Sequence, residues 1–393
     1  MSKNKNICMV YWYYLPQLGG IETLMHSFAK ELGKRDYNLH ILAGPCKNEG
    51  PEPDNTTVTR TDLLDRSVLE NKNMDKDLFD FITNYIKENN IDVLHLHNFQ
   101  RPHAINHTST LYHAAKNLGI PIILQVHHRP FENVERKIIS SYDWDRILTV
   151  SKWVGEGVLE SGVDSKNIEI LYNCVDNTVF HPEKKDSELR KKFGVKEDEK
   201  LILCPTRLVG STGEEVTRKR YKDLLKAASI LSEKMDDFKL LITAIENPNF
   251  EKKCKEIKNS IKEKAELFDI KDKLIIPDSN IPQETMPSLY SSSELVVLPS
   301  VKEAFGIVYI EAMASGVPVI GTTSGAVPEV IKHKITGRLI EPKNTFSLSQ
   351  AIYHILRDED TYQKYSDNGI KHVSDYFSSK KITDQLISVY KDL

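Results

Sequence analysis

The fold class is indicated most clearly by residues 299–320, PSVKEAFGIVYIEAMASGVPVI. The first residues of this stretch are expected to end a strand, and a short polar loop follows. The pattern over about 306–314 has helical periodicity, and a second apolar run comes after it. Strand, helix and strand in this order form a βαβ unit with parallel strands. The loop places the backbone N–H groups of Phe305, Gly306 and Ile307 at the amino end of the helix, where the dipole and the unpaired donors favour an anion.

The same alternation of short apolar runs and longer helical patterns continues through the whole chain. We expect strands in the first half at residues 7–12, 39–42, 93–96, 122–126, 147–150 and 168–171, and helices at 21–32, 77–87 and 151–160. After residue 176 we expect strands at 201–204, 240–243, 274–276, 295–298 and 317–320. Such alternation predicts parallel sheets that are covered by helices on both faces.

The length of 393 residues exceeds what one ordinary core supports, so two domains are expected. A polar stretch, residues 181–186, reads as the linker between them. We place the first Rossmann-like domain at residues 1–177 and the second at 178–370. The amphipathic segment within 371–393 has no strand after it, so it is expected to pack back on the first domain.

Composition excludes several classes of protein. A net charge of −3 argues against a dedicated nucleic-acid binder, and the Lys-rich run 252–264 reads as the solvated face of a charged helix. Five scattered cysteines fit a reducing cytosol. The sequence shows no secretory signal and no apolar run of the ~20 residues that span a bilayer. A cytoplasmic protein is expected, with contact to the inner face of the membrane left open.

Two acidic residues flank the anion-favouring loop. Glu303 and Glu311 are eight residues apart, which is roughly 12 Å along a helix at ~1.5 Å per residue. The paired carboxylates of a glycosidase stand only about 5–9.5 Å apart. The spacing suits instead two hydroxyl-rich groups separated by a diphosphate, with Gly306 letting the diphosphate approach the backbone.

Glu303, Phe305-Gly306 and Glu311, followed by Ala-Met-Ala-x-Gly-x-Pro-Val, resemble the retaining glycosyltransferases of family 4. The resemblance extends from residues 16–22 to the closing helix. It implies the GT-B fold, in which an acceptor-side domain and a nucleotide-sugar-binding domain face each other across a cleft. It also implies a nucleotide diphosphate sugar as donor (a UDP-sugar first, a GDP-sugar next) and transfer without a metal or another cofactor.

In the first domain the resemblance implies two contacts with substrate. Gly19 and Gly20 form the loop that approaches the donor phosphate or the acceptor. His127 lies against the donor sugar, although the neighbouring His128 leaves this assignment open by one residue. Cys174 stands where the family usually has glycine before the interdomain hinge, and we expect it to be a packed thiol.

In the second domain the resemblance implies that Arg207 and a lysine bind the diphosphate. The lysine is placed at Lys219, but an insertion at residues 210–218 leaves Arg218 and Lys222 open as alternatives. Arg220 stands where the family has glycine.

Other second-domain residues complete the implied donor site. Glu303 holds sugar hydroxyls, Glu311 holds the ribose, and Pro277 packs on the base. Ala304, with the three backbone N–H groups that follow it, contributes to donor binding. Residues 324–331, which include Glu329, match a family segment that is mainly structural.

The acceptor is left open as an unknown sugar, a lipid-linked molecule or a small molecule that bears a hydroxyl. The product would belong to a glycan, a glycolipid or a cell-surface polysaccharide, and the enzyme would be a monomer or homodimer. Two alternatives keep the fold: a nucleotide-sugar epimerase and a non-catalytic subunit that binds sugar nucleotides.

Overall fold

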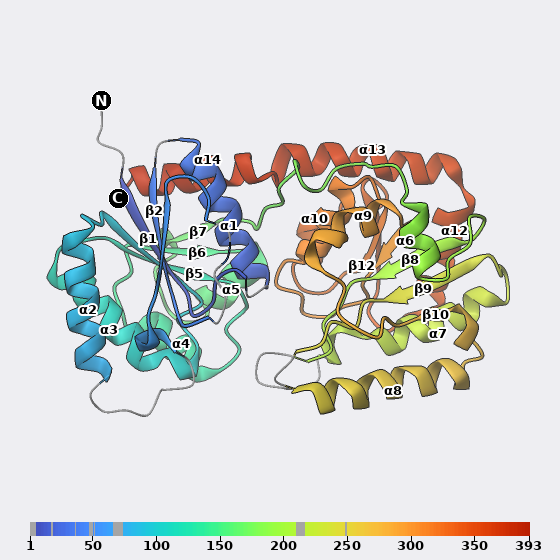
Figure 1. Cartoon of the computed structure of the whole chain (residues 1–393), viewed down its shortest axis with the longest axis horizontal. Helices are drawn as coiled ribbons and strands as arrows, with labels where there is room; N and C mark the ends of the chain where they lie inside the picture. The colour runs from blue at the N-terminus through green and yellow to red at the C-terminus, as the bar shows by residue number, and fades with distance from the viewer. Residues whose placement is uncertain are drawn as a thin grey trace. The chain divides into compact units, whose positions relative to one another are not determined.

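The computed structural model describes residues 5–16, 19–35, 37–46, 50, 52–65, 74–209, 217–247 and 250–393. The chain forms two compact units. Unit 1 comprises Met1–Cys174 together with Ser379–Leu393, and unit 2 comprises Val175–Ser378. Each unit is an α/β domain built on its own sheet, as expected from the sequence (Figure 1).

The sheet of unit 1 has seven parallel strands in the order β3-β2-β1-β4-β5-β6-β7. These strands are β1 (Asn6–Val10), β2 (Asn38–Ala43), β3 (Thr56–Arg60), β4 (Val93–His97), β5 (Ile122–Val126), β6 (Arg146–Thr149) and β7 (Ile168–Ile170). The α-helices of this unit are α1 (Gly20–Gly33), α2 (Met74–Glu88), α3 (Ile105–Asn117), α4 (Asn133–Ser140), α5 (Lys152–Leu159) and α14 (Ser379–Lys391). The central strands β4 and β5 are buried along their whole length because helices cover both faces.

The C-terminal helix α14 completes the core of unit 1. It contacts α1, and its side chains Ile382, Leu386 and Tyr390 are fully buried in a cluster that includes Phe28 of α1. The expectation that the last helix packs on the first domain is therefore confirmed.

The sheet of unit 2 has six parallel strands in the order β10-β9-β8-β11-β12-β13. They are β8 (Lys200–Cys204), β9 (Phe238–Ile242), β10 (Leu274–Ile275), β11 (Leu295–Val297), β12 (Val319–Thr322) and β13 (Gly337–Ile340). Its α-helices are α6 (Ser187–Lys192), α7 (Tyr221–Ser232), α8 (Glu251–Leu267), α9 (Met286–Ser291), α10 (Ile307–Ala314), α11 (Val327–Val330), α12 (Thr345–Arg357) and α13 (Glu359–Tyr376).

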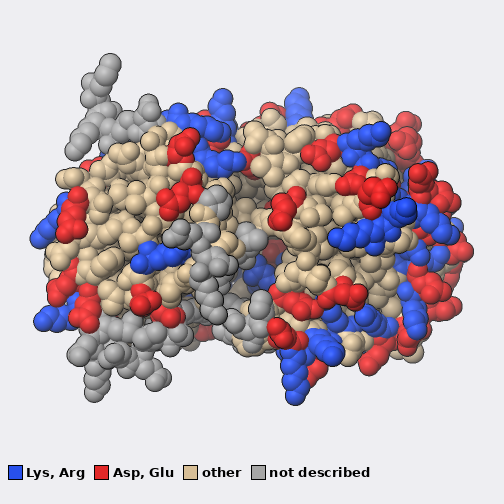
Figure 2. Space-filling view, viewed as in Figure 1, with Lys and Arg blue, Asp and Glu red and all other residues tan. Residues whose placement is uncertain are grey.

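The surface carries both signs of charge. Figure 2 shows Lys and Arg side chains interspersed with Asp and Glu on the face in view. In the part of the chain that the structure describes, none of the helices combines the length and the apolar character needed to cross a membrane.

Candidate active site

The loop between β11 and α10 ends at Gly306, a position where any residue other than glycine would be strained. Gly306 caps α10 with φ +93°, and a Cβ there would lie 2.6 Å from the ring of Tyr309. The Tyr309 hydroxyl is fixed in turn, because it donates to the Leu298 carbonyl over 2.6 Å. The Tyr309 N–H donates to the Gly306 carbonyl over 3.0 Å, whereas the amides of Ile307 and Val308, at the start of α10, precede the first hydrogen bond of the helix and can bind an anion.

The residues before this glycine differ in exposure. Ala304 is partly exposed, whereas Phe305 is buried against the ring of Phe377 at a centroid distance of 5.5 Å. Phe305 therefore anchors the loop, and Ala304 and Ile307 lie at the partly exposed surface.

The backbone of Glu303 is held by the segment that follows β12. The Ala326 N–H donates to the Glu303 carbonyl over 2.8 Å, and the Lys302 N–H donates to the Ser324 hydroxyl over 3.0 Å. Gly325, with φ +71°, lies so close that a Cβ would stand 2.5 Å from the Glu303 carbonyl oxygen. This segment, expected to be structural, fixes the position of Glu303.

The Glu303 carboxylate forms an ion pair with Lys219. The Lys219 ammonium lies 2.8 Å from Oε2 of Glu303, and both side chains are largely buried, with 16% and 13% exposed. Burial alone would raise the pKa of Glu303, but the Lys219 charge outweighs it and holds the pKa below its usual value. Glu303 is therefore ionised at neutral pH.

The structure separates Lys219 from the two alternatives. Arg218 and Lys222 are exposed, and Lys222 lies over the Tyr221 ring. Residues 210–216 of the insertion lie outside the described residues, and Arg218, at its end, accepts a backbone hydrogen bond from Val301 over 2.8 Å. Of these three cations, Lys219 alone is joined to Glu303 by an ion pair.

Arg220, at the family's glycine position, has a left-handed backbone with φ 52° and caps α7. Its guanidinium pairs with Asp223 in the first turn of α7, with Nη2 and Oδ1 2.9 Å apart. A non-glycine residue experiences strain of about 1–2 kcal/mol in this conformation.

Arg207 lies in the segment after β8. Its side chain is exposed, and its backbone pairs with Ile245 after β9 through hydrogen bonds from Leu208 and to Thr206. Because the strands are parallel, these segments share the carboxyl edge of the sheet, where ligands bind in open α/β domains.

The loop that contains Pro277 is supported by a buried lysine. Lys258 of α8 is 8% exposed, donates to the Pro277 carbonyl over 2.8 Å and pairs with Glu246 at 2.5 Å. Asn280 joins the same loop to the backbone of Glu246 at 2.7 and 3.0 Å. The Lys-rich run was expected to face solvent, which is wrong for Lys258.

Glu311 lies on α10, where it accepts a hydrogen bond from the Tyr290 hydroxyl over 2.7 Å. Burial raises its pKa to about 7, because the Tyr290 hydrogen bond offsets the loss of solvent only in part. The two acids of the sequence motif thus have different environments.

In unit 1, Gly19 and Gly20 lie at the amino end of α1. Gly19 caps this helix in an extended conformation, and its carbonyl accepts from the Thr23 N–H and hydroxyl at 3.0 and 2.9 Å. A Cβ on Gly19 would collide with Oε2 of the Glu22 carboxylate, so a larger residue there would have to displace that side chain.

His127 follows β5 at the carboxyl edge of the same sheet and is partly exposed. Its Nε2 lies 3.1 Å from Nδ1 of His97, and burial lowers its pKa to about 3, with smaller contributions from His95 and His128. The ring of His128 is instead engaged by Glu135 at 2.7 Å and by Asn98 at 3.0 Å.

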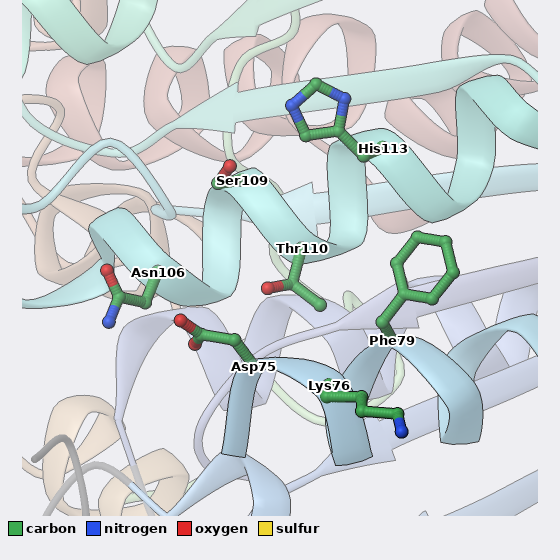
Figure 3. A pocket seen from close by; sticks show the side chains of 7 residues that line it. All are labelled: Asp75, Lys76, Phe79, Asn106, Ser109, Thr110 and His113. Carbon is green, nitrogen blue, oxygen red and sulfur yellow. The ribbon is translucent and has the colours of Figure 1, made fainter. Parts of the chain in front are cut away.

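A hollow of about 400 Å³ in unit 1 lies apart from these residues. Figure 3 shows it between α2 and α3, lined by Asp75, Lys76, Phe79, Asn106, Ser109, Thr110 and His113. None of its lining residues belongs to the expected site.

Comparison with known proteins gives consistent matches along the chain. The model of the family "Glycosyltransferase Family 4" matches residues 18–179, and that of "Glycosyl transferases group 1" matches residues 185–372. The chain is 28% identical to N-acetyl-alpha-D-glucosaminyl L-malate synthase of Bacillus anthracis over 96% of its length and 95% of the relative.

Solved structures agree in fold. Sucrose-phosphate synthase from Thermosynechococcus elongatus superposes with a TM-score of 0.79 at 18% identity, covering 99% of both chains. HepE of Anabaena, in complex with UDP and glucose, gives a TM-score of 0.78 at 15% identity and covers 99% of this chain and 100% of its own.

Proposed function

Because the chain belongs to glycosyltransferase family 4, with the GT-B fold and a retaining transfer from a nucleotide sugar, we propose that its donor is a UDP-sugar and its acceptor a small hydroxy acid. The main observation in support of a donor site is the buried ion pair of Lys219 and Glu303 beside the amino end of α10. A cation, a carboxylate and open helix amides at one edge of a sheet suit a diphosphate joined to a sugar.

Each group has a distinct task in the proposed reaction. Lys219, Arg207 and the α10 amides stabilise the negative charge that the diphosphate gains as it leaves. Glu303 accepts hydrogen bonds from sugar hydroxyls, Glu311 from the ribose, and the loop at Pro277 packs on the base. Arg207 is suited to phosphate because its guanidinium donates in a planar fork.

The transfer takes place on one face of the sugar. The bond from the anomeric carbon to the β-phosphate oxygen breaks with its electron pair on the phosphate. The acceptor hydroxyl oxygen bonds to the same carbon from the same side, and its proton passes to the leaving phosphate. His127 and the loop of Gly19 and Gly20 position the reacting groups.

The choice of substrates rests on relatives. The Bacillus anthracis relative, which is matched over nearly its full length, is named for transfer to L-malate. HepE, which shares the fold, was solved with UDP and glucose. These names favour UDP over GDP and a hydroxy acid over a lipid-linked acceptor.

The test is a matrix of UDP-, GDP- and ADP-sugars against L-malate, a sugar phosphate and a lipid-linked sugar. Release of nucleoside diphosphate and the anomeric configuration of the product, read by NMR, are the measurements. We expect UDP release that depends on L-malate, an α-linked product from an α-linked donor, and a loss of about 10²–10³-fold in kcat for Glu303→Ala. Turnover by Glu303→Ala at the wild-type rate would contradict the site.

The same assay separates the alternatives. An epimerase would convert donor to its epimer without any acceptor, and a non-catalytic subunit would bind donor without releasing UDP. We expect neither result. Because Lys219 and Arg207 supply the positive charge, EDTA is expected to leave turnover unchanged.

We also propose a cytoplasmic location. The five cysteines of the chain are free, which suits a reducing compartment. Contact with a membrane would follow only if the lipid-linked acceptor were the one used.

A further inference from the structure

Three histidine rings form a row on one face of the sheet of unit 1. His95 and His97 are alternate residues of β4, so they point to the same face, and both are fully buried. The His95 and His97 ring centroids are 4.4 Å apart, and those of His97 and His127 are 5.3 Å apart. At the far end of the row, Nδ1 of His95 lies 2.8 Å from the hydroxyl of Tyr390 in α14.

A hydrogen bond joins the rings of His97 and His127. Nδ1 of His97 and Nε2 of His127 are 3.1 Å apart, which is a hydrogen bond, so one of these two nitrogens carries the hydrogen. Both rings are neutral, because burial lowers the pKa of His127 to about 3 and that of His97 well below its usual value. Two arrangements remain, and they differ in which histidine donates.

The other nitrogen of His97 decides between them. Nε2 of His97 is buried and has no hydrogen-bond partner among the described residues. If His127 donated, the proton of His97 would sit on this nitrogen as a buried N–H without an acceptor. If His97 donates, only a lone pair is left unpaired there, and buried N–H groups without partners are the rarer of the two.

We propose that His97 is a positioning residue that fixes the tautomer of His127. By donating from its own Nδ1, it places the proton of His127 on Nδ1. His127 then presents a neutral N–H to the ligand, and it serves as a hydrogen-bond donor to a hydroxyl or phosphate oxygen. Nδ1 of His127 forms no hydrogen bond with any residue that the structure describes, so it is available for this contact. The functional part of this inference rests on the proposed role of His127.

The direct test is the tautomer of His127 in the wild-type full-length protein. Two-bond ¹H–¹⁵N correlation spectra of ¹⁵N-histidine-labelled protein distinguish the two forms, and the spectrum of His127→Gln assigns the signals. We expect the Nδ1–H form, which is the minor form of histidine in water. The Nε2–H form in the wild-type protein would overturn the proposal.

Two variants of His97 whose new side chains are similar to each other in size, Asn and Leu, show whether His97 fixes the tautomer of His127. Asn places an amide near the position of Nδ1 and can still donate, whereas Leu cannot. We expect His127 to keep the Nδ1–H form in His97→Asn and to change to the Nε2–H form in His97→Leu. Persistence of the Nδ1–H form in folded His97→Leu would overturn the proposal.

Kinetics connect the tautomer to function. We expect kcat/KM to fall at least tenfold in His97→Leu and to stay within threefold of wild type in His97→Asn. UDP affinity, assigned to unit 2, should be unchanged in both. If His127→Gln kept full turnover, the proposed role of His127 would be wrong, while the wild-type spectrum would still test the tautomer.

Discussion

Glu303 and Glu311 occupy one motif, yet their carboxyl groups differ in charge state. The Lys219 ammonium, 2.8 Å away, keeps the pKa of Glu303 low despite its burial. Glu311 has the neutral Tyr290 hydroxyl as its partner, and burial raises its pKa to about 7. The spacing of the motif singled out Glu303 and Glu311 as candidate site residues. The difference in their pKa values arises from Lys219 and Tyr290, which lie outside the motif.

Donor affinity is therefore expected to depend on pH through Glu311. In the proposed site the ionised carboxylate accepts hydrogen bonds from the ribose hydroxyls more strongly than the protonated acid does, so affinity is expected to rise as pH increases through about 7. Between pH 6 and 8 the ionised fraction changes about tenfold, which sets the upper bound for the change in affinity. Calorimetry with a UDP-sugar measures the affinity at each pH. A UDP-sugar is suitable because its diphosphate ester does not itself titrate between pH 6 and 8. Glu311→Gln should flatten the profile, and an unchanged slope in that variant would contradict the assignment.

The pair of His97 and His127 shows which features of the site the sequence predicts and which it does not. Alternation along β4 places His95 and His97 on one face, and the parallel neighbour β5 leads to His127. The hydrogen bond between His97 and His127 depends on register and ring orientation, which periodicity does not determine. Lys258 is a similar case, since its helix is charged but its ammonium faces inward to Pro277.

Among the elements, every strand in the interior of the two sheets was expected from the sequence, and so were the edge strands β7 and β10. The two strands not anticipated, β3 and β13, each lie at the opposite edge of their sheet. β3 reads Thr-Thr-Val-Thr-Arg and is partly exposed, and β13 begins with Gly337. An edge strand lacks neighbours on one side, so its sequence need not be a continuous apolar run, and the pattern that identifies central strands is missing.

The segment after β12 is expected to matter for activity because it holds Glu303. Gly325→Ala puts a Cβ 2.5 Å from the Glu303 carbonyl oxygen, at φ +71°. We expect a loss of stability of about 1–2 kcal/mol from the backbone alone, and a loss of turnover as Glu303 shifts. Thermal unfolding and kcat are the measurements.

Gly194 provides the matched control for this variant. It lies in the same unit at φ +70°, but a Cβ there would meet nothing within 4 Å. Gly194→Ala should therefore lose only the stability of about 1–2 kcal/mol that comes from the backbone and keep full turnover. Equal turnover in the two variants would show that Gly325 does not position Glu303.

At the scale of the whole molecule, the chain ends by returning to unit 1. Leu386 of α14 is fully buried in the core cluster with α1, whereas its neighbour Gln385 is exposed. Leu386→Ala is expected to cost about 2–5 kcal/mol, and Gln385→Ala almost nothing. Hydrogen exchange read by mass spectrometry should show faster exchange in unit 1 peptides only. If hydrogen exchange in unit 2 peptides became faster by the same factor, the two units would not have separate hydrophobic cores.

The donor site rests on the proposal that Lys219 and the amino end of α10 hold the donor diphosphate, while Glu303 keeps the Lys219 ammonium in place. Calorimetric titration of UDP into Lys219→Met tests it most directly, with Lys222→Met, at an exposed lysine of α7, as the control. Losing a charged hydrogen bond of about 1.5–3 kcal/mol predicts UDP binding weaker by about 10- to 100-fold in Lys219→Met and unchanged in Lys222→Met. Wild-type affinity in a folded Lys219→Met protein would contradict the claim.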